Sequence, residues 1–241
     1  DALPISSTAV MEFIVANRVE GVGDMAAGRP TLRQFLLREP QKDESIPHIA
    51  AVMEDIAQAS RRISLLLSQG ALGGALGAAG TENVQGEEQK KLDIISNEIM
   101  IECLEWSAHW AGLASEEIDD IVVVPGPQSP SGRYLCLFDP LDGSSNIDTN
   151  VSIGTIFSIY PAEDTAEASF LRPTRQQIGA GYVIYGPRCA MMVSFGDGVQ
   201  QYLLDPDTGA FRLVDGRLTM PDCSFEFAIN ASNYRHWSRP I

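Results

Sequence analysis

Two aspartates in the stretch 138–148 (FDPLDGSSNID) are the residues whose spacing most directly suggests chemistry. Asp139 and Asp142 follow the apolar run 134–138, which predicts a buried strand that stops where the aspartates begin. Pro140 stiffens the link between them. Two carboxylates held this close predict a site for a hard divalent cation.

The residues after the second aspartate favour binding of an anion. Gly143 frees the backbone, and Ser144 and Ser145 offer hydroxyls and successive N–H groups. Carboxylates beside such donors suit a cation that itself touches a phosphate. The alternative is a polar turn that closes a strand, with Ser144 as a helix cap. The full run of eleven residues is more specific than the short DPxDG pattern and favours the site.

A second acidic pair lies earlier in the chain, where Glu116 and Glu117 end a strand expected at 111–114. A strand at 121–124 and the central strand at 133–138 read as a hairpin. If these strands are neighbours, four carboxylates converge on one edge of a sheet, and cations would relieve their mutual repulsion. Oxygen ligands without nearby His or Cys predict Mg²⁺, or Mn²⁺, rather than zinc. Taken alone, the pair would be read as an exposed acidic turn.

Two acidic residues are candidates for activating water. Glu117 is either a metal ligand or a general base, and Asp93 could act on a neighbouring hydroxyl from a second helix. The sequence does not separate these roles. His109 reads as structural, and no Cys/His or Ser/His/Asp nucleophile pattern stands out. Hydrolysis would therefore use a water activated by metal, with two ions able to stabilise the entering and leaving oxygens.

The pattern of elements predicts a layered α/β or α+β domain: two helices, then a run of strands. The helices are expected at about 46–68, with Ser45 as N-cap, and at 87–106. A glycine-rich stretch at 70–86 reads as a flexible loop or a lid. Further strands are expected at 155–160, 178–185, 189–195, 199–204 and 210–215, with a surface loop at 161–176 and a tight turn at 205–209.

Composition narrows the possible partners. The net charge of −15 argues against nucleic acid and against an anionic membrane surface. No run of eighteen apolar residues occurs, the first fifteen residues do not read as a secretory signal, and the four cysteines form no CxxC motif. We expect reduced thiols and a cytoplasmic location.

The motifs together resemble those of class I fructose-1,6-bisphosphatases. The resemblance rests on 138–160 (FDPLDGSSNIDTNVSIGTIFSIY), on 81–93 (TENVQGEEQKKLD), on Glu116–Glu117, and on 180–186, 204–214 and 227–237. It covers roughly residues 31–241; the DPxDG part is shared with inositol monophosphatase-like enzymes. It implies the layered α-β-α-β-α sugar-phosphatase fold, usually a homotetramer. The implied reaction is hydrolysis of the 1-phosphate of D-fructose 1,6-bisphosphate to D-fructose 6-phosphate and phosphate, in gluconeogenesis or the Calvin cycle.

The resemblance also assigns roles, residue by residue. It implies metal ligation of two or more Mg²⁺ ions by Glu116, Glu117, Asp139, the Leu141 carbonyl and Asp142. Asp93 and Glu117 would activate water. Substrate would be bound by Asp142, Gly143, Ser144, Ser145, Asn230 and Tyr234, the last two on the 6-phosphate side. Glu87 stands where the family has a loop aspartate.

Departures from the family qualify these expectations. The poorly patterned residues 1–30 are expected to form a mobile arm, followed by a metal- and phosphate-binding domain at 31–215. The family continues about a hundred residues further, and residues 216–241 are expected to be the start of its sugar-binding domain. Family members that AMP inhibits have a GTGE-type helix start that binds the nucleotide phosphate. Residues 44–48 differ from it here, although the basic-aromatic pair Arg133–Tyr134 resembles the family's, so inhibition by AMP is in doubt. No cysteine lies in 161–176, so a thiol switch is not expected.

Two alternative functions stay open: an enzyme that also accepts sedoheptulose 1,7-bisphosphate, and a non-catalytic metal-binding subunit.

Overall fold

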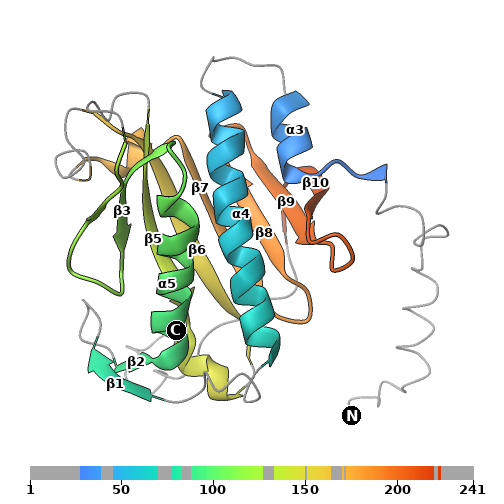
Figure 1. Cartoon of the computed structure of the whole chain (residues 1–241). Helices are drawn as coiled ribbons and strands as arrows, with labels where there is room; N and C mark the ends of the chain where they lie inside the picture. Colours follow the sequence, from blue (N-terminus) through green and yellow to red (C-terminus); the bar gives the residue numbers. More distant parts are fainter. Residues whose placement is uncertain are drawn as a thin grey trace, which may run out of the picture.

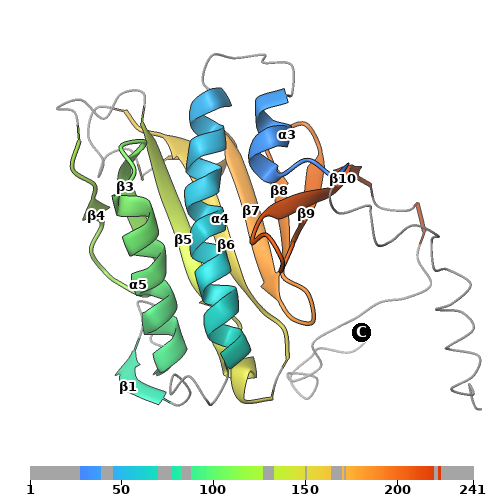
Figure 2. The ribbon, with the colours of Figure 1, turned by 45° about the vertical axis from the view of Figure 1, so that its right-hand side comes forward.

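The protein is built on one eight-stranded sheet with helices packed on one of its faces (Figure 1). A computed structural model describes residues 28–38, 46–69, 78–82, 88–126, 133–149, 151–163, 170, 172–219 and 222–223. Figure 2 shows α4 and α5 side by side across the sheet, with α3 beside α4. The prediction of an α/β fold is confirmed. The sequence predictions for the arm before residue 28, and for Ser45, Glu87, Asn230 and Tyr234, lie outside the described residues.

Three helices cover the sheet: α3 (Leu32–Arg38), α4 (Ile46–Gln69) and α5 (Lys91–Glu105). Apolar side chains recur at helical spacing along α4, and Val52, Met53 and Ile56 are fully buried against the sheet. The predicted helix at 46–68 is thus confirmed. The second helix begins later than predicted, because Glu88–Lys90 form a short strand that precedes it. No helix in the described part of the chain is both long and apolar enough to cross a bilayer.

The strands follow the helices in the chain, as expected, and their order in the large sheet is β10-β9-β8-β7-β6-β5-β3-β4. Neighbours are antiparallel except β3 and β5, which are parallel. Their bounds are β3 Trp110–Ser115, β4 Val122–Val123, β5 Tyr134–Asp142, β6 Ile153–Pro161, β7 Gly179–Tyr185, β8 Ala190–Ser194, β9 Val199–Leu204 and β10 Phe211–Leu218. Short 3₁₀ turns lie at η2 (Ser144–Thr149) and η3 (Thr174–Gln176).

The predicted hairpin between 121–124 and 133–138 is wrong. The first of these segments, β4, pairs with β3, and β3 then separates it from β5. The physical reason is burial: β5 is buried along most of its length and belongs inside the sheet, whereas the two-residue β4 is half exposed and suits an edge. The strand β5 also runs on through Asp142 instead of stopping at Phe138.

The glycine-rich stretch is not a loop throughout. Ala78–Glu82 form β1, which pairs antiparallel with β2 (Glu88–Lys90) in a separate two-stranded sheet. The rest of that stretch lies outside the described residues, so the lid remains a prediction.

Alternation along the strands divides the sheet into a covered face and an open face. In β6, Thr155, Phe157 and Ile159 are buried towards the helices, whereas Ile156 is 47% exposed. The neighbour of Ile156 on β7 is Tyr182, which is 44% exposed. Among the described residues, helices therefore cover only one face, and acidic side chains of the site lie at the end of the other.

Candidate active site

The acidic side chains are brought together by the parallel pairing of β3 and β5. Because the two strands run in the same direction, their carboxyl ends meet at one edge of the sheet. The amide of Glu116, directly after β3, donates to the carbonyl of Phe138 in β5 at 3.1 Å. We predicted from the sequence that these acidic residues come together across a hairpin, whereas in the structure the parallel pairing of β3 and β5 brings them together. In Figure 1 the first turn of α5 and the η2 turn lie at this same lower end of the molecule.

Glu116 and Asp139 form the centre of the site. Their carboxyl groups are hydrogen-bonded to each other, which requires a shared proton. Burial, and then the bond to Glu116, raise the pKa of Asp139 to about 8, while Asp142 adds a smaller electrostatic effect. The amide of Leu141 donates to Asp139 Oδ1 at 3.0 Å and acts in the opposite direction. In the part of the chain that is described, no Arg or Lys forms an ion pair with these carboxylates.

Asp142 begins the segment expected to hold a phosphate. Gly143 follows with φ of +80°, a backbone conformation that favours glycine, and the amide of Asn146 donates to the Gly143 carbonyl at 2.8 Å. Ser144 and Ser145 then open the η2 turn, the first half buried and the second exposed. A pocket of about 370 Å³ adjoins this turn on the open face of the sheet, lined by Asp142, Gly143, Asn146, Ser152, Ile153, Gly154, Thr155, Ile156, Tyr182, Val183 and Ile184.

The two candidate water-activating residues occupy different elements. Glu117 is half buried in the turn after β3, and its backbone amide donates to the Ser115 hydroxyl oxygen at 3.2 Å. Asp93 lies in the first turn of α5 and is only 2% exposed. The polar residues Ser96 and Asn97 are buried on the same helix. A buried carboxylate in the first turn is favoured by the helix dipole, and its position on α5 agrees with the sequence expectation that it does not face solvent.

The residues present fit a cation in part. Buried, crowded carboxylates that must share a proton are the arrangement that a divalent ion would stabilise. Within the described residues, however, no three His, Cys, Asp or Glu side chains are already grouped closely enough to hold an ion. The structure brings Glu116 and Asp139 together, with Asp142 nearby. The assignment of individual metal ligands therefore remains a prediction.

Sequence reasoning missed the polar residues that support this edge from beneath. Thr155 is fully buried on β6, and Tyr185 on β7 is 5% exposed. The signal available was a threonine within an apolar strand, directly after Gly154. A larger cavity of about 600 Å³ shares Ser152 and Ile153 with the first pocket but includes none of the predicted catalytic side chains; it is lined by Ser64, Leu67, Ser68, Leu92, Ile147, Val151, Ser152, Ile153, Tyr185, Gly186 and Pro187.

Comparisons with known proteins agree with this architecture. Residues 30–216 match the family described as fructose-1-6-bisphosphatase, N-terminal domain. A class 1 fructose-1,6-bisphosphatase of Paracoccus denitrificans is 57% identical over 202 residues, which are 83% of this chain and 58% of that protein. The chain thus spans 58% of the length of this curated relative.

Solved structures extend the comparison to the fold. The holo form of Leishmania major fructose-1,6-bisphosphatase aligns with a TM-score of 0.77 at 28% identity, covering 88% of this chain and 66% of that one. Its apo form aligns with a TM-score of 0.71 at 27% identity, over 88% and 64%. The fold is thus that of solved fructose-1,6-bisphosphatase structures over 88% of this chain. With the family match over 30–216, the chain belongs to the fructose-1,6-bisphosphatase family.

Proposed function

We propose that this chain carries the metal- and phosphate-binding part of a Mg²⁺-dependent phosphatase that releases the 1-phosphate of D-fructose 1,6-bisphosphate. The observation that carries the proposal is the hydrogen-bonded pair of Glu116 and Asp139, held where the parallel strands β3 and β5 end together. The names of the relatives supply the sugar bisphosphate as substrate. The crowded carboxylates supply the reason for a divalent cation.

Glu116, Asp139, Asp142 and the Leu141 carbonyl would hold the ions, with Glu117 as a further ligand. When bound, Mg²⁺ would neutralise charge on the phosphate and lower the pKa of a coordinated water. The protein's own contribution is geometric, since the sheet edge holds Asp139 and Glu116 in contact before any ion arrives. That preorganisation keeps the ligands in place during the reaction.

The proton taken from the attacking water would pass to the carboxylate of Glu117 or to that of Asp93, either of which could act as the general base. Gly143, Ser144 and Ser145 would cradle the 1-phosphate with backbone N–H groups and hydroxyls, in the turn that the positive φ of Gly143 begins. Asn230 and Tyr234, outside the described residues, would contact the 6-phosphate side.

The decisive experiment measures phosphate release by the purified protein after its intact mass has been determined. Fructose 1,6-bisphosphate and sedoheptulose 1,7-bisphosphate are supplied separately, each with and without Mg²⁺. We expect release from the fructose substrate only with the cation, and fructose 6-phosphate as the sugar product. Comparable turnover of both sugars would replace the proposal with a dual-specificity enzyme. A protein of 26.1 kDa that binds Mg²⁺ but releases no phosphate would support the non-catalytic subunit instead.

The remaining features of the proposal concern organisation. We propose a binding domain at 31–215, preceded by an arm and followed by the start of a sugar-binding domain, and a cytoplasmic homotetramer acting in gluconeogenesis or the Calvin cycle. The match to an N-terminal domain over 30–216 supports the central boundary pair. Light scattering of the purified protein tests the assembly, and a stable monomer at micromolar concentration would contradict it.

A further inference from the structure

The two site aspartates share a face of the sheet only because β5 contains a bulge. Asp139 pairs with Ile156 and Asp142 pairs with Gly154, so two residues of β5, Pro140 and Leu141, oppose the single residue Thr155. Side chains alternate along a strand, and residues three apart would normally point to opposite faces. One extra residue restores the phase. Leu141 accordingly joins the same apolar core as Phe138, three positions earlier, and is 2% exposed.

A buried pair of hydroxyls holds this bulge. Thr155 Oγ1 donates to the Pro140 carbonyl at 2.8 Å, and the same oxygen lies 2.8 Å from the hydroxyl of Tyr185. A threonine hydroxyl has one proton, which is committed to Pro140, so Tyr185 must be the donor to Thr155. Burial raises the pKa of Tyr185 well above its ordinary value, so the phenol retains the proton it donates.

The bond from Thr155 meets a specific need. The extra residue of a bulge interrupts the regular ladder of backbone bonds, and the Thr155 hydroxyl supplies a donor to the Pro140 carbonyl at this interruption. A buried carbonyl without one would cost about 1–3 kcal/mol. The neighbouring position is also constrained, because a Cβ on Gly154 would stand 2.6 Å from the Val183 carbonyl of β7. The three strands β5, β6 and β7 thus fit closely at this point.

We propose that Thr155 and Tyr185 are positioning residues of the phosphatase site: through the Pro140 carbonyl they fix the bulge, and the bulge aims Asp139 and Asp142 at the same face. Neither residue touches substrate in this role. The inference rests on the proposed function for its catalytic consequence, but its geometric part concerns only the contacts of β5, β6 and β7.

The kinetic test compares Thr155→Val, which removes the donor, with Thr155→Ser, which keeps it. For Thr155→Val we expect a fall in kcat of about 10- to 100-fold and a similar rise in the Mg²⁺ concentration needed for half-maximal activity, with little change in KM. For Thr155→Ser, both kcat and the Mg²⁺ requirement should stay within about threefold of the original protein's values, because the serine hydroxyl can still donate to the Pro140 carbonyl. Tyr185→Phe should lie between them, because Thr155 keeps its bond to Pro140 but loses the donor that orients it.

A matched control lies at the far end of the sheet. The hydroxyl of Thr208 donates to Asp205 Oδ2 at 2.6 Å, and Thr208→Val makes the same chemical change away from the site. It should alter neither kcat nor the Mg²⁺ requirement. Equal effects of Thr155→Val and Thr208→Val would overturn the inference, since they would show a general loss of stability.

Crystal structures of the original protein, of Thr155→Val and of Tyr185→Phe separate this inference from the proposed function. A shifted bulge, with Asp142 moved relative to Asp139, supports the positioning role even if the original protein releases no phosphate, a result that would remove only the proposed function. An unchanged bulge in both variants overturns the inference whatever the activity. Should Thr155→Val fail to fold, Tyr185→Phe decides, because it preserves the packing of the ring.

Discussion

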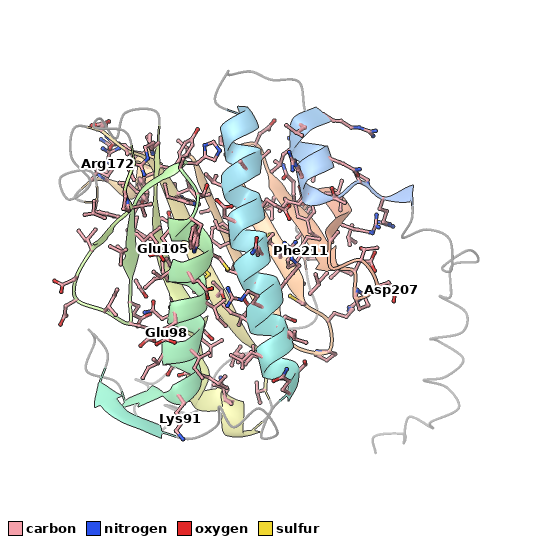
Figure 3. All side chains as sticks on the ribbon, in the orientation of Figure 1. Lys91, Glu98, Glu105, Arg172, Asp207 and Phe211 are labelled. Atoms are coloured by element: carbon pink, nitrogen blue, oxygen red, sulfur yellow. The ribbon has the colours of Figure 1, made fainter. Side chains whose placement is uncertain are left out.

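Two aspartates on well-separated strands of the sheet have opposite electrostatic surroundings: Asp139 in β5 and Asp205 directly after β9. Burial and the bond to Glu116 raise the pKa of Asp139 to about 8. By contrast, Asp205 accepts hydrogen bonds from Thr208 Oγ1 at 2.6 Å and Arg212 Nε at 2.7 Å. Those bonds, with a further one from the Asp207 amide, lower the pKa of Asp205 to about 2. In Figure 3, Asp207 marks the turn that contains Asp205, across the molecule from Lys91 at the start of α5.

The difference separates a structural carboxylate from one suited to bind a ligand. Around Asp205, donors from the turn and from β10 complete the hydrogen bonding, and Arg212 also reaches the carbonyl of Arg29 at 3.1 Å to hold the segment before α3. Around Asp139, the neighbours are the carboxyl groups of Glu116 and Asp142 and the backbone amide of Leu141. Crowded carboxyl groups of this kind lower the stability of the fold, and a bound cation relieves their repulsion.

The largest effect is expected from Asp139→Asn. Loss of one ligand charge should lower turnover by two or more orders of magnitude, because metal-assisted charge stabilisation contributes several kcal/mol. Folding should be nearly unaffected, since the amide can still donate to Glu116. Phosphate release and thermal melting measure both quantities. Asp205→Asn serves as control and should keep its activity; unchanged turnover in Asp139→Asn would contradict the site assignment.

Cation binding should stabilise the acidic site selectively. At a Mg²⁺ or Mn²⁺ concentration one hundred times Kd, the free energy of unfolding should rise by about 2.7 kcal/mol. Chemical denaturation with and without the cation measures this change. Asp139→Asn should lose most of it and Asp205→Asn none. Equal stabilisation of all three proteins would indicate binding elsewhere on the acidic surface.

The pH dependence of stability should differ in sign between the two aspartates. Without cations, folded Asp139 keeps its proton up to about pH 8, whereas in the unfolded chain it ionises near 3.8. The folded state therefore binds more protons in this window, and the contribution of Asp139 to stability falls as the pH rises through it. Denaturation curves collected across this range should show a flatter dependence for Asp139→Asn. An identical slope in the variant would remove the carboxyl pair as its source.

The smallest effect is expected from Asp205→Asn, because this carboxylate already has its hydrogen-bond donors. The pKa of folded Asp205 is about 2, below that of the unfolded chain, so its stabilisation is present above about pH 4 and is lost as the pH falls towards 2. Asp205→Asn should melt slightly lower at neutral pH and behave like the original protein at the acid end. A variant that is less stable by the same amount at both pH values would contradict the ionic explanation.

Part of this molecule was predictable from local sequence alone. The apolar spacing along 46–68 defines a helix with one buried face, and the turn at 205–209 follows from its Asp, Pro and Gly residues. The eleven residues at 138–148, together with Glu116 and Glu117, indicated an acidic site, and with the other matching segments they indicated the family. These features depend on neighbours in the chain, which a sequence displays directly.

Only the tertiary structure decided which strands are neighbours and which way the carboxylates point. The run 121–124 reads like a partner for 133–138, yet β3 lies between them, because pairing depends on burial summed over the whole sheet. Strict alternation would place Asp139 and Asp142 on opposite faces, and the bulge opposite Thr155 reverses that outcome. Its support comes from Tyr185, thirty residues further along the chain than Thr155, and contacts at that separation leave no local pattern.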